Sequence, residues 1–91
     1  MPPKVTVLMP VYNGERFLRD AIDSMLRQTF DDFELLIVND GSTDSSRDII
    51  LSYADPRIRL IENEKNKGII AALNRGIELA KGQYIARMDA D

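Results

Sequence analysis

The sequence contains no cysteine and no histidine. Without cysteine, the chain has no disulfide framework, no thiolate metal site and no thiol nucleophile. Without histidine, this stretch also lacks the usual zinc sites and the histidine-dependent catalytic triads. Any metal ligand or reactive group therefore has to come from carboxylates, amides, hydroxyls or the backbone.

Basic stripes and long apolar runs are missing too. The net charge is −3, and lysine and arginine are scattered among acids, which argues against nucleic acid as the main partner. No apolar run approaches the length of a membrane span, and residues 1–4 are too short for a signal peptide. We expect a cytoplasmic module, although a missing remainder could associate with a membrane on the cytoplasmic side.

The composition is that of one small globular domain. The chain has 91 residues, of which 44% are hydrophobic and 30% charged, so global disorder is not expected. We assign residues 1–4 to a flexible leader and residues 5–91 to a single α/β unit.

Short apolar runs alternate with amphipathic stretches along the chain. The pattern predicts strands over 5–9, 33–38, 58–62 and 83–88, and helices over 15–28, 45–54 and 69–81. Pro10 is expected to stop the first strand. Asn13 is expected to cap the first helix, Ser45 with Asp48 to form a capping box, and Gly82 to take the C′ position of the third helix. The third helix is expected to bury one face, formed by Leu73, Ile77 and Ala80.

This order predicts a three-layer α/β/α fold with a parallel four-stranded sheet. The third run alternates in polarity and is placed at a sheet edge, whereas the fourth is predicted to be buried. If the fourth strand lies beside the first, the loops after strands one, two and four meet at the point where strand order reverses. Those loops carry Tyr12 and Asn13, residues 39–42, and residues 89–91.

Asp89 and Asp91 end the chain as a D-x-D pair. Residues two apart on an extended backbone point to the same side, and carboxylates are hard ligands suited to Mg²⁺ or Mn²⁺. A pair of solvated acids is the alternative for an isolated D-x-D. Because the chain stops at the pair, we expect it to be a fragment.

Two common nucleotide signatures are absent. No G-x-G-x-x-G follows the first strand, and no G-x-x-x-x-G-K-[ST] occurs, so neither a dinucleotide-binding domain nor a P-loop is expected. A nucleotide bound at an acidic rim would need a cation to neutralise its phosphates.

Several stretches occur in a recognisable order: VTVLMPVYN (5–13), VNDGS (38–42), NKG (66–68), ALNRGI (72–77), GQYI (82–85) and DAD (89–91). Together they resemble the nucleotide-sugar half of a family 2 glycosyltransferase with the GT-A fold. The resemblance covers the chain from Lys4 onward. It implies a nucleotide-binding set and a metal ligand for Mn²⁺ or Mg²⁺: Pro10, Tyr12, Asn13, Asp40, Gly68 and Asp89 for the nucleotide, and Asp91 for the metal.

The resemblance also implies roles for single residues. Pro10 and Tyr12 would line the base pocket, and Asp40 would accept a hydrogen bond from the base, usually uracil. Asp89 would lie near the ribose, and Asp91 would hold the metal on the diphosphate. The parent enzyme would transfer a sugar from a UDP-sugar to an acceptor hydroxyl with inversion, in cell-surface polysaccharide synthesis. Its acceptor would be a carbohydrate or lipid-linked, and its catalytic base would lie downstream, so none is expected here.

Some of these residues have simpler interpretations. Tyr12 could be a half-buried turn aromatic, and Asp40 could be the capping acid of the turn at residues 40–42. Many family members carry arginine where this chain has Leu73. Arg75 is therefore either a phosphate contact or a solvated arginine on a helix face.

A non-enzymatic module is the alternative from another class. Receiver-like domains also place acids around Mg²⁺ at strand ends, but they need an acidic cluster directly after the first strand. If the fourth strand is interior in the sheet of a longer parent, its far edge lacks a neighbour in this chain. We then expect self-association through residues 83–88, or marginal stability.

Overall fold

The computed structural model describes residues 2–89. Strands and helices alternate along the chain in the predicted order: β1 (Val5–Val11), α1 (Glu15–Leu26), β2 (Phe33–Asp40), α2 (Ser46–Leu51), β3 (Ile58–Asn63), α3 (Ile69–Leu79) and β4 (Tyr84–Arg87).

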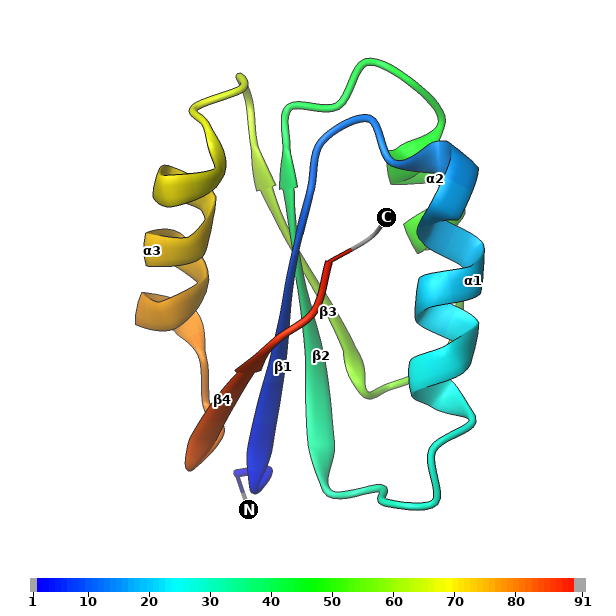
Figure 1. Cartoon of the computed structure of the whole chain (residues 1–91), viewed down its shortest axis with the longest axis vertical. Coiled ribbons are helices and arrows are strands. Elements are labelled where there is room, and N and C mark those ends of the chain that lie inside the picture. Colours follow the sequence, from blue (N-terminus) through cyan, green and yellow to red (C-terminus); the bar gives the residue numbers. More distant parts are fainter. Residues whose placement is uncertain (1, 90–91) are drawn as a thin grey trace.

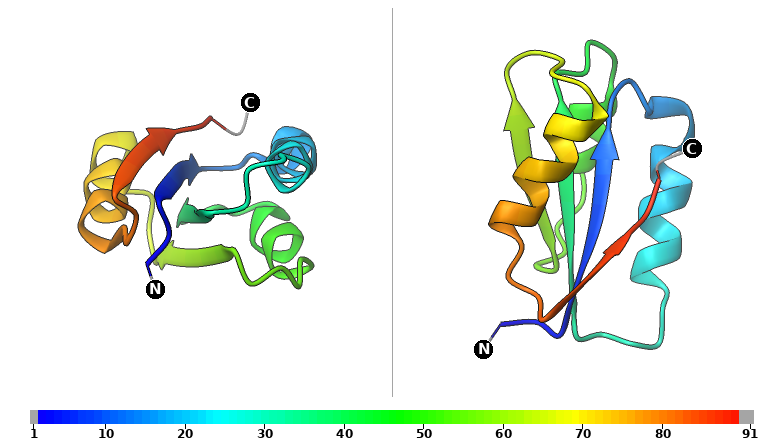
Figure 2. Two further views of the ribbon diagram at one scale, coloured as in Figure 1. Left: turned by 90° about the horizontal axis from the view of Figure 1, so that it is seen from below. Right: turned by 60° about the vertical axis from the view of Figure 1, so that its left-hand side comes forward.

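The four strands form one parallel sheet in the order β3-β2-β1-β4. Helices α1 and α2 cover one face and α3 covers the other, which confirms the three-layer fold (Figures 1 and 2). The edge position of β3 and the pairing of β4 with β1 are both confirmed. Strand order therefore reverses at β1, where the sequence predicted a site.

The core consists of two layers, one on each side of the sheet. Alternate residues of β1 point to opposite faces, so Val7 and Met9 pack with Leu18 and Ile22 of α1. On the other face, Leu8 packs in a smaller cluster with Ala72 of α3. Every residue of β2 is buried, which explains the nearly continuous apolar run in its sequence.

The predicted buried face of α3 is confirmed in part. Leu73 and Ala80 pack against the core, but Ile77 is half exposed, and the fully buried residues are Ala72 and Gly76. A Cβ atom at Gly76 would lie only 2.2 Å from Cδ1 of Leu8. Small residues at these positions thus let the helix lie close to the sheet.

The starts of α1 and α2 also differ from the prediction. Neither N-cap residue, Gly14 or Ser45, makes a side-chain cap bond, so the N-cap at Asn13 and the capping box of Ser45 with Asp48 are wrong. Both helices are shorter than predicted and end at Leu26 and Leu51.

The starts of the two helices exchange hydrogen bonds, and Asp44 also caps α2 directly, since its carboxylate accepts the N–H of Ser46 at 2.9 Å. The N–H of Glu15 donates to the Asp44 carboxylate at 3.2 Å, and the N–H of Gly14 donates to Ser46 Oγ at 3.0 Å. In return, the N–H of Ser45 donates to the Glu15 carboxylate at 3.0 Å. These exchanged bonds satisfy helix N–H groups that have no partner within their own helix, and they lock the loop after β1 to the loop after β2.

Pro10 does not stop β1, which continues to Val11. The carbonyl groups of Lys4 and Leu8 accept hydrogen bonds from the N–H groups of Tyr84 and Met88. The backbone N–H and C=O groups of even-numbered β1 residues therefore point toward β4. Pro10 lies beyond the last paired residue, Leu8, and its missing N–H therefore removes no hydrogen bond from the sheet.

Strand β4 is shorter than predicted, and all of its residues are exposed, so its assignment as a buried strand is wrong. It lies at a sheet edge. Gly82 is not a helix C′ residue, because α3 already ends in an extended conformation at Ala80. A Cβ at Gly82 would lie 2.3 Å from the backbone nitrogen of Thr6, so glycine is needed there for close approach.

Among residues 2–89, no helix is long and apolar enough to cross a membrane.

Candidate functional site

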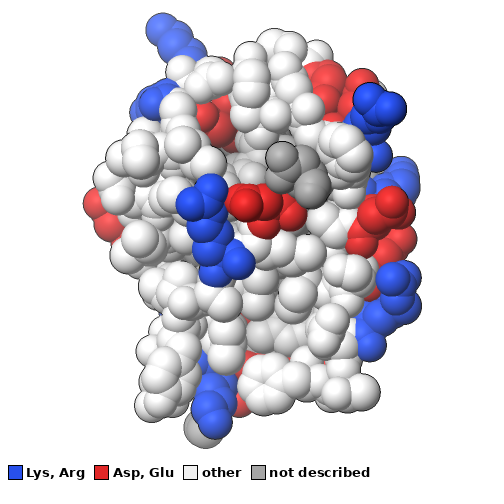
Figure 3. All heavy atoms as spheres, in the orientation of Figure 1, with Lys and Arg blue, Asp and Glu red and all other residues white. Residues whose placement is uncertain are grey.

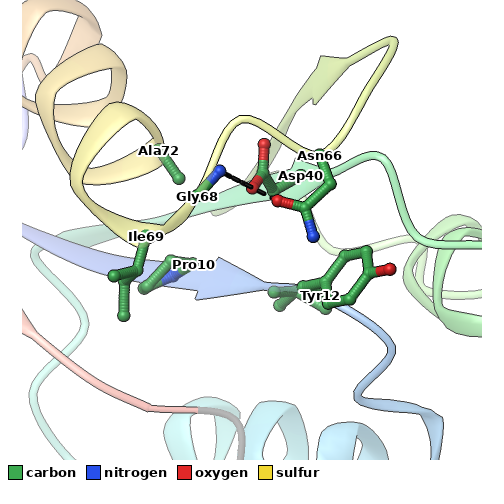
Figure 4. A pocket seen from close by; sticks show the side chains of 8 residues that line it. Pro10, Tyr12, Asp40, Asn66, Gly68, Ile69 and Ala72 are labelled. Atoms are coloured by element: carbon green, nitrogen blue, oxygen red, sulfur yellow. Dashed lines mark hydrogen bonds between the residues drawn. The ribbon is translucent and has the colours of Figure 1, made fainter.

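Two adjoining hollows lie beside the end of β1, where strand order reverses. The inner hollow, of about 230 Å³, is lined by Pro10, Val11, Tyr12, Asp40, Asn66, Gly68, Ile69 and Ala72 (Figure 4). The outer hollow, of about 440 Å³, is lined by Pro10, Tyr12, Asn13, Gly14, Phe17, Ile69, Arg87 and Asp89. The two share Pro10, Tyr12 and Ile69. All predicted nucleotide residues thus line one hollow or the other.

Apolar and aromatic groups form one side of the inner hollow. Pro10 and Ile69 lie next to each other, and the ring of Tyr12 lies just beyond the end of β1 (Figure 4). The Tyr12 side chain is 50% exposed, so the ring is available to a ligand. A planar aromatic group beside apolar walls is suited to stacking against another flat ring.

Asp40 supplies the charge of the inner hollow. Only 3% of the residue is exposed, yet its carboxylate is well paired. Asn63 Nδ2 donates at 2.8 Å, and the backbone N–H groups of Lys67 and Gly68 donate at 3.0 and 2.9 Å. Burial raises the pKa of Asp40, but these bonds and the charge of Lys67 outweigh it, so the pKa lies below its ordinary value. Asp40 is therefore a buried, ionised acceptor.

These bonds settle the local role of Asp40. It does not cap its own turn, because its partners lie in the 66–68 turn that leads into α3. Asn66 closes that turn, since its Oδ1 accepts the N–H of Gly68 at 2.9 Å. Gly68 has φ of +94°, and a Cβ there would meet no atom within 4 Å, so its surroundings are open.

Asn13 lines the outer hollow, but its carbonyl oxygen serves the neighbouring loop. Oδ1 accepts the N–H groups of Thr43 at 2.8 Å and Asp44 at 3.3 Å. The backbone N–H of Asn13 donates to Ser42 Oγ at 2.9 Å. Its φ of +50° is a conformation that asparagine tolerates better than most residues. Asn13 thus holds the rim of the outer hollow together.

The outer hollow carries an ion pair. Arg87 bonds to Oδ1 of Asp89 through Nε at 3.2 Å and through a terminal nitrogen at 3.1 Å. Phe17 of α1 is 46% exposed and lines this hollow. On the face seen in Figure 3, one group of basic and acidic side chains lies near the centre, and the other charged side chains lie mainly toward the margins.

Asp91 lies outside the described residues, so its proposed contact with a metal stays a prediction. Within residues 2–89, no three acidic side chains are grouped as a metal would need. The carboxylate of Asp89 is the right type of ligand for a hard divalent cation, but one carboxylate needs further oxygen donors beside it.

Arg75 lies exposed on α3, as one of its two interpretations predicted, and its contact with a phosphate stays a prediction. Its guanidinium donates to Asn63 Oδ1 and, at 2.9 Å, to the backbone carbonyl of Glu62. Asn63, Asn66 and Ile69 also contribute to the site, although the sequence did not single them out. Nothing local to residue 63 or 75 indicates that the two side chains meet.

Known structures share this architecture. TarS of S. aureus, residues 1–349 in complex with UDP, matches with a TM-score of 0.90 at 28% identity, over 97% of this chain and 27% of that one. The mannosyltransferase PcManGT of Pyrobaculum calidifontis, in complex with GDP-Man and Mn²⁺, also matches with a TM-score of 0.90 at 28% identity, over 100% of this chain and 28% of that one. The fold is that of the GT-A glycosyltransferases.

The sequence comparisons agree with the fold. The chain belongs to glycosyl transferase family 2, whose sequence model matches residues 6–91. It is 46% identical over 93 residues to the uncharacterized glycosyltransferase EpsJ of Bacillus subtilis, covering 100% of this chain and 27% of that protein. It is 40% identical over 87 residues to WfgD of Escherichia coli, a UDP-Glc:alpha-D-GlcNAc-diphosphoundecaprenol beta-1,3-glucosyltransferase, covering 96% of this chain and 34% of that protein.

Two conclusions follow. The resemblance to family 2 glycosyltransferases is confirmed, and the receiver-like alternative is set aside. The chain spans 27% and 34% of the lengths of these two relatives, so it corresponds to a part of each.

Proposed function

We propose that this chain is the nucleotide-sugar-binding part of a family 2 glycosyltransferase and that its donor is a UDP-sugar. The observation that carries the proposal is the inner hollow, where an exposed Tyr12 ring lies near the buried carboxylate of Asp40. A solved neighbour binds UDP and UDP-GlcNAc, and another binds GDP-Man. The hollow has the two features needed to hold a nucleobase, a stacking surface and a fixed hydrogen-bond acceptor.

The carboxylate of Asp40 gives a reason to prefer uracil. The carboxylate of Asp40 accepts four hydrogen bonds from three donors, because the N–H of Lys67 is shared between its two oxygens at 3.0 and 3.2 Å. A base N–H would take the place of the longer Lys67 bond. Uracil carries an N3–H donor, whereas N3 of cytosine is an acceptor and would face the negative charge. A mismatched base would leave a buried acceptor unpaired, which is a strong basis for rejection.

The outer hollow is the proposed place of the ribose and diphosphate. Asp89 would lie near the ribose, and Asp91 would hold Mn²⁺ or Mg²⁺, as the GDP-Man complex of PcManGT contains Mn²⁺. When bound, such an ion neutralises the charge of the diphosphate leaving group. Arg87 is held by Asp89 at the rim of this hollow, which places one positive group beside the proposed phosphate position.

The remaining steps belong to the parent protein. The parent would transfer a hexosyl group to an acceptor hydroxyl with inversion, using a carboxylate base that lies outside residues 1–91. A lipid-linked or carbohydrate acceptor is in keeping with the name of WfgD, a glucosyltransferase whose acceptor is alpha-D-GlcNAc-diphosphoundecaprenol. Residues 1–91 alone would bind the donor without transferring it.

Calorimetric titration of UDP tests the proposal, first with Mn²⁺ and then with a chelator in its place. We expect metal-dependent binding that is weakened in both Asp40→Asn and Asp91→Asn. A chain extended past Asp91 serves as the control, because a terminal carboxylate could chelate metal by itself. If neither the short nor the extended chain binds UDP, the proposed function is wrong.

A further inference from the structure

Three side chains form a continuous hydrogen-bonded relay that begins at the exposed Arg75 and ends at Asp40 in the inner hollow. Arg75 of α3 donates to Oδ1 of Asn63 at the end of β3, and Asn63 Nδ2 donates to Oδ1 of Asp40 at 2.8 Å. Asn63 and Asp40 are 5% and 3% exposed, so neither exchanges these bonds freely with water. A second bond anchors the arginine, which also donates to the backbone carbonyl of Glu62 at 2.9 Å.

The relay fixes the orientation of the Asn63 amide. Arginine has only donors, so the group of Asn63 that faces Arg75 has to be its oxygen. An ionised carboxylate only accepts, so the group that faces Asp40 has to be the NH₂. With Arg75 removed, only Asp40 orients the amide, and the Asn63 oxygen loses the donor that anchors it, so the side chain is held at one end instead of two.

We propose that Arg75 is a positioning residue that sets the base selectivity of the inner hollow by holding Asn63 in the orientation that aims Asp40. This inference rests on the proposed function, because it concerns the nucleobase of the same donor. Three donors fix the plane of the Asp40 carboxylate: Asn63 Nδ2 and the N–H groups of Lys67 and Gly68. Loss of the side-chain donor leaves only the turn at 66–68 to orient the carboxylate.

Arg75→Ala also removes a positive charge, and Arg47→Ala is the matched control for that effect. Arg47 of α2 pairs with the carboxylate of Glu62 at 2.7 Å. Arg47 and Arg75 therefore both bond to Glu62, Arg47 to its carboxylate and Arg75 to its backbone carbonyl. Within the described residues, Arg47 makes no hydrogen bond to Asn63. Replacing either arginine by alanine removes one positive charge, and only Arg75→Ala breaks the relay.

The first test measures the dissociation constants of UDP and CDP at one Mg²⁺ concentration. We expect Arg75→Ala to lower the ratio of the CDP to the UDP dissociation constant by about tenfold, and Arg47→Ala to leave that ratio unchanged. Equal weakening of both nucleotides in Arg75→Ala would overturn the proposal, because a phosphate contact or partial unfolding has that effect. An unchanged ratio would overturn it as well.

A second test needs no nucleotide. Amide hydrogen exchange at Lys67 and Gly68 reports how firmly Asp40 is held, since both N–H groups donate to its carboxylate. We expect Arg75→Ala to speed their exchange by about tenfold, with β2 amides unchanged and Arg47→Ala without effect. If the unaltered chain binds neither nucleotide, the proposed function fails, and the exchange rates alone decide whether the relay positions Asp40.

Discussion

The carboxylate of Asp40 accepts the backbone N–H of Gly68 at 2.9 Å, across 28 residues of sequence. This bond joins the end of β2 to the turn that starts α3, and it closes one side of the inner hollow. Because the same carboxylate also accepts from Asn63 and Lys67, it is fixed before any ligand arrives. The structure thus presents a preorganised acceptor, which lowers the entropic cost of binding.

Gly76 provides the first prediction. A Cβ there would lie 2.2 Å from Cδ1 of Leu8, which is 1% exposed and has little room to move. We expect Gly76→Ala to lower the free energy of unfolding by about 1–3 kcal/mol, although alanine is the better helix former. Urea denaturation measures this change.

The double variant Leu8→Ala/Gly76→Ala checks the cause. Leu8→Ala alone should cost about 2–5 kcal/mol by leaving a cavity. The two losses should sum to more than the loss in the double variant, because the new methyl group fills part of the space vacated by Leu8. Strict additivity would show that the two residues do not compete for the same space.

Glu34 provides the second prediction. It is 5% exposed and accepts from Thr6 Oγ1 at 2.5 Å, from Arg59 at 2.6 Å and from the N–H of Lys81 at 2.7 Å. It therefore fixes the connection between α3 and β4. We expect Glu34→Gln to cost about 3 kcal/mol, since it leaves buried donors poorly paired. The exposed pair of Glu62 with Arg47 is the control, and Glu62→Gln should cost less than about 1 kcal/mol.

The contribution of Glu34 should depend on pH. Burial raises its pKa, but the hydrogen bonds from Thr6, Arg59 and Lys81 and the charge of Arg59 outweigh burial, so the folded-state pKa lies below the ordinary value. The stabilisation is then fully present above the unfolded-state pKa, near about 4.3, and is lost as pH falls through the folded-state pKa. The difference in unfolding free energy between the unaltered chain and Glu34→Gln should be constant from pH 7 to about pH 5.5 and shrink below about pH 4. A difference that grows on acidification would contradict this assignment.

The edge of β4 provides the third prediction. The N–H groups of Tyr84 and Met88 point toward β1, so those of Ile85 and Arg87 point away from the sheet. We propose that this edge pairs with a second copy of the chain. Sedimentation velocity should show association that increases with concentration.

Two proline variants distinguish a loss of association from a loss of folding stability. Ile85→Pro removes an outward N–H and should abolish association while the chain stays folded. Ala86→Pro removes an N–H directed at β1 and should destabilise the fold by about 1 kcal/mol or more. Association that persists unchanged in Ile85→Pro would show that the contact lies elsewhere.

Local patterns were enough to predict the strands in chain order and their parallel sheet. The apolar run of β2 indicated a central strand, and the alternation in β3 indicated an edge. Because parallel strands end at the same edge of a sheet, Tyr12 and Asp40 were predicted to lie at one edge. These inferences succeed because periodicity and chain order depend little on which side chains meet.

Partnerships across the chain could not be predicted. The sequence offered Ser45 and Asp48 as a local capping box, but Ser45 bonds to Glu15 of another helix. Arg75 is exposed, as one interpretation predicted, but its bond to Asn63 was not predicted. A polar side chain has several partners of similar energy, and tertiary geometry decides among them. The exposure of β4 was missed because an apolar strand sequence does not reveal whether anything covers it.

The most direct test of the central claim maps UDP onto the chain by NMR. UDP is titrated into the ¹⁵N-labelled protein with Mg²⁺, and amide shifts are followed residue by residue. We predict saturable shifts at Tyr12, Asp40, Lys67 and Gly68, which surround the inner hollow, and their loss in Asp40→Asn. Shifts confined to another surface, such as the apolar hollow beside Phe30 and Phe33, or no shifts at all, would contradict the account.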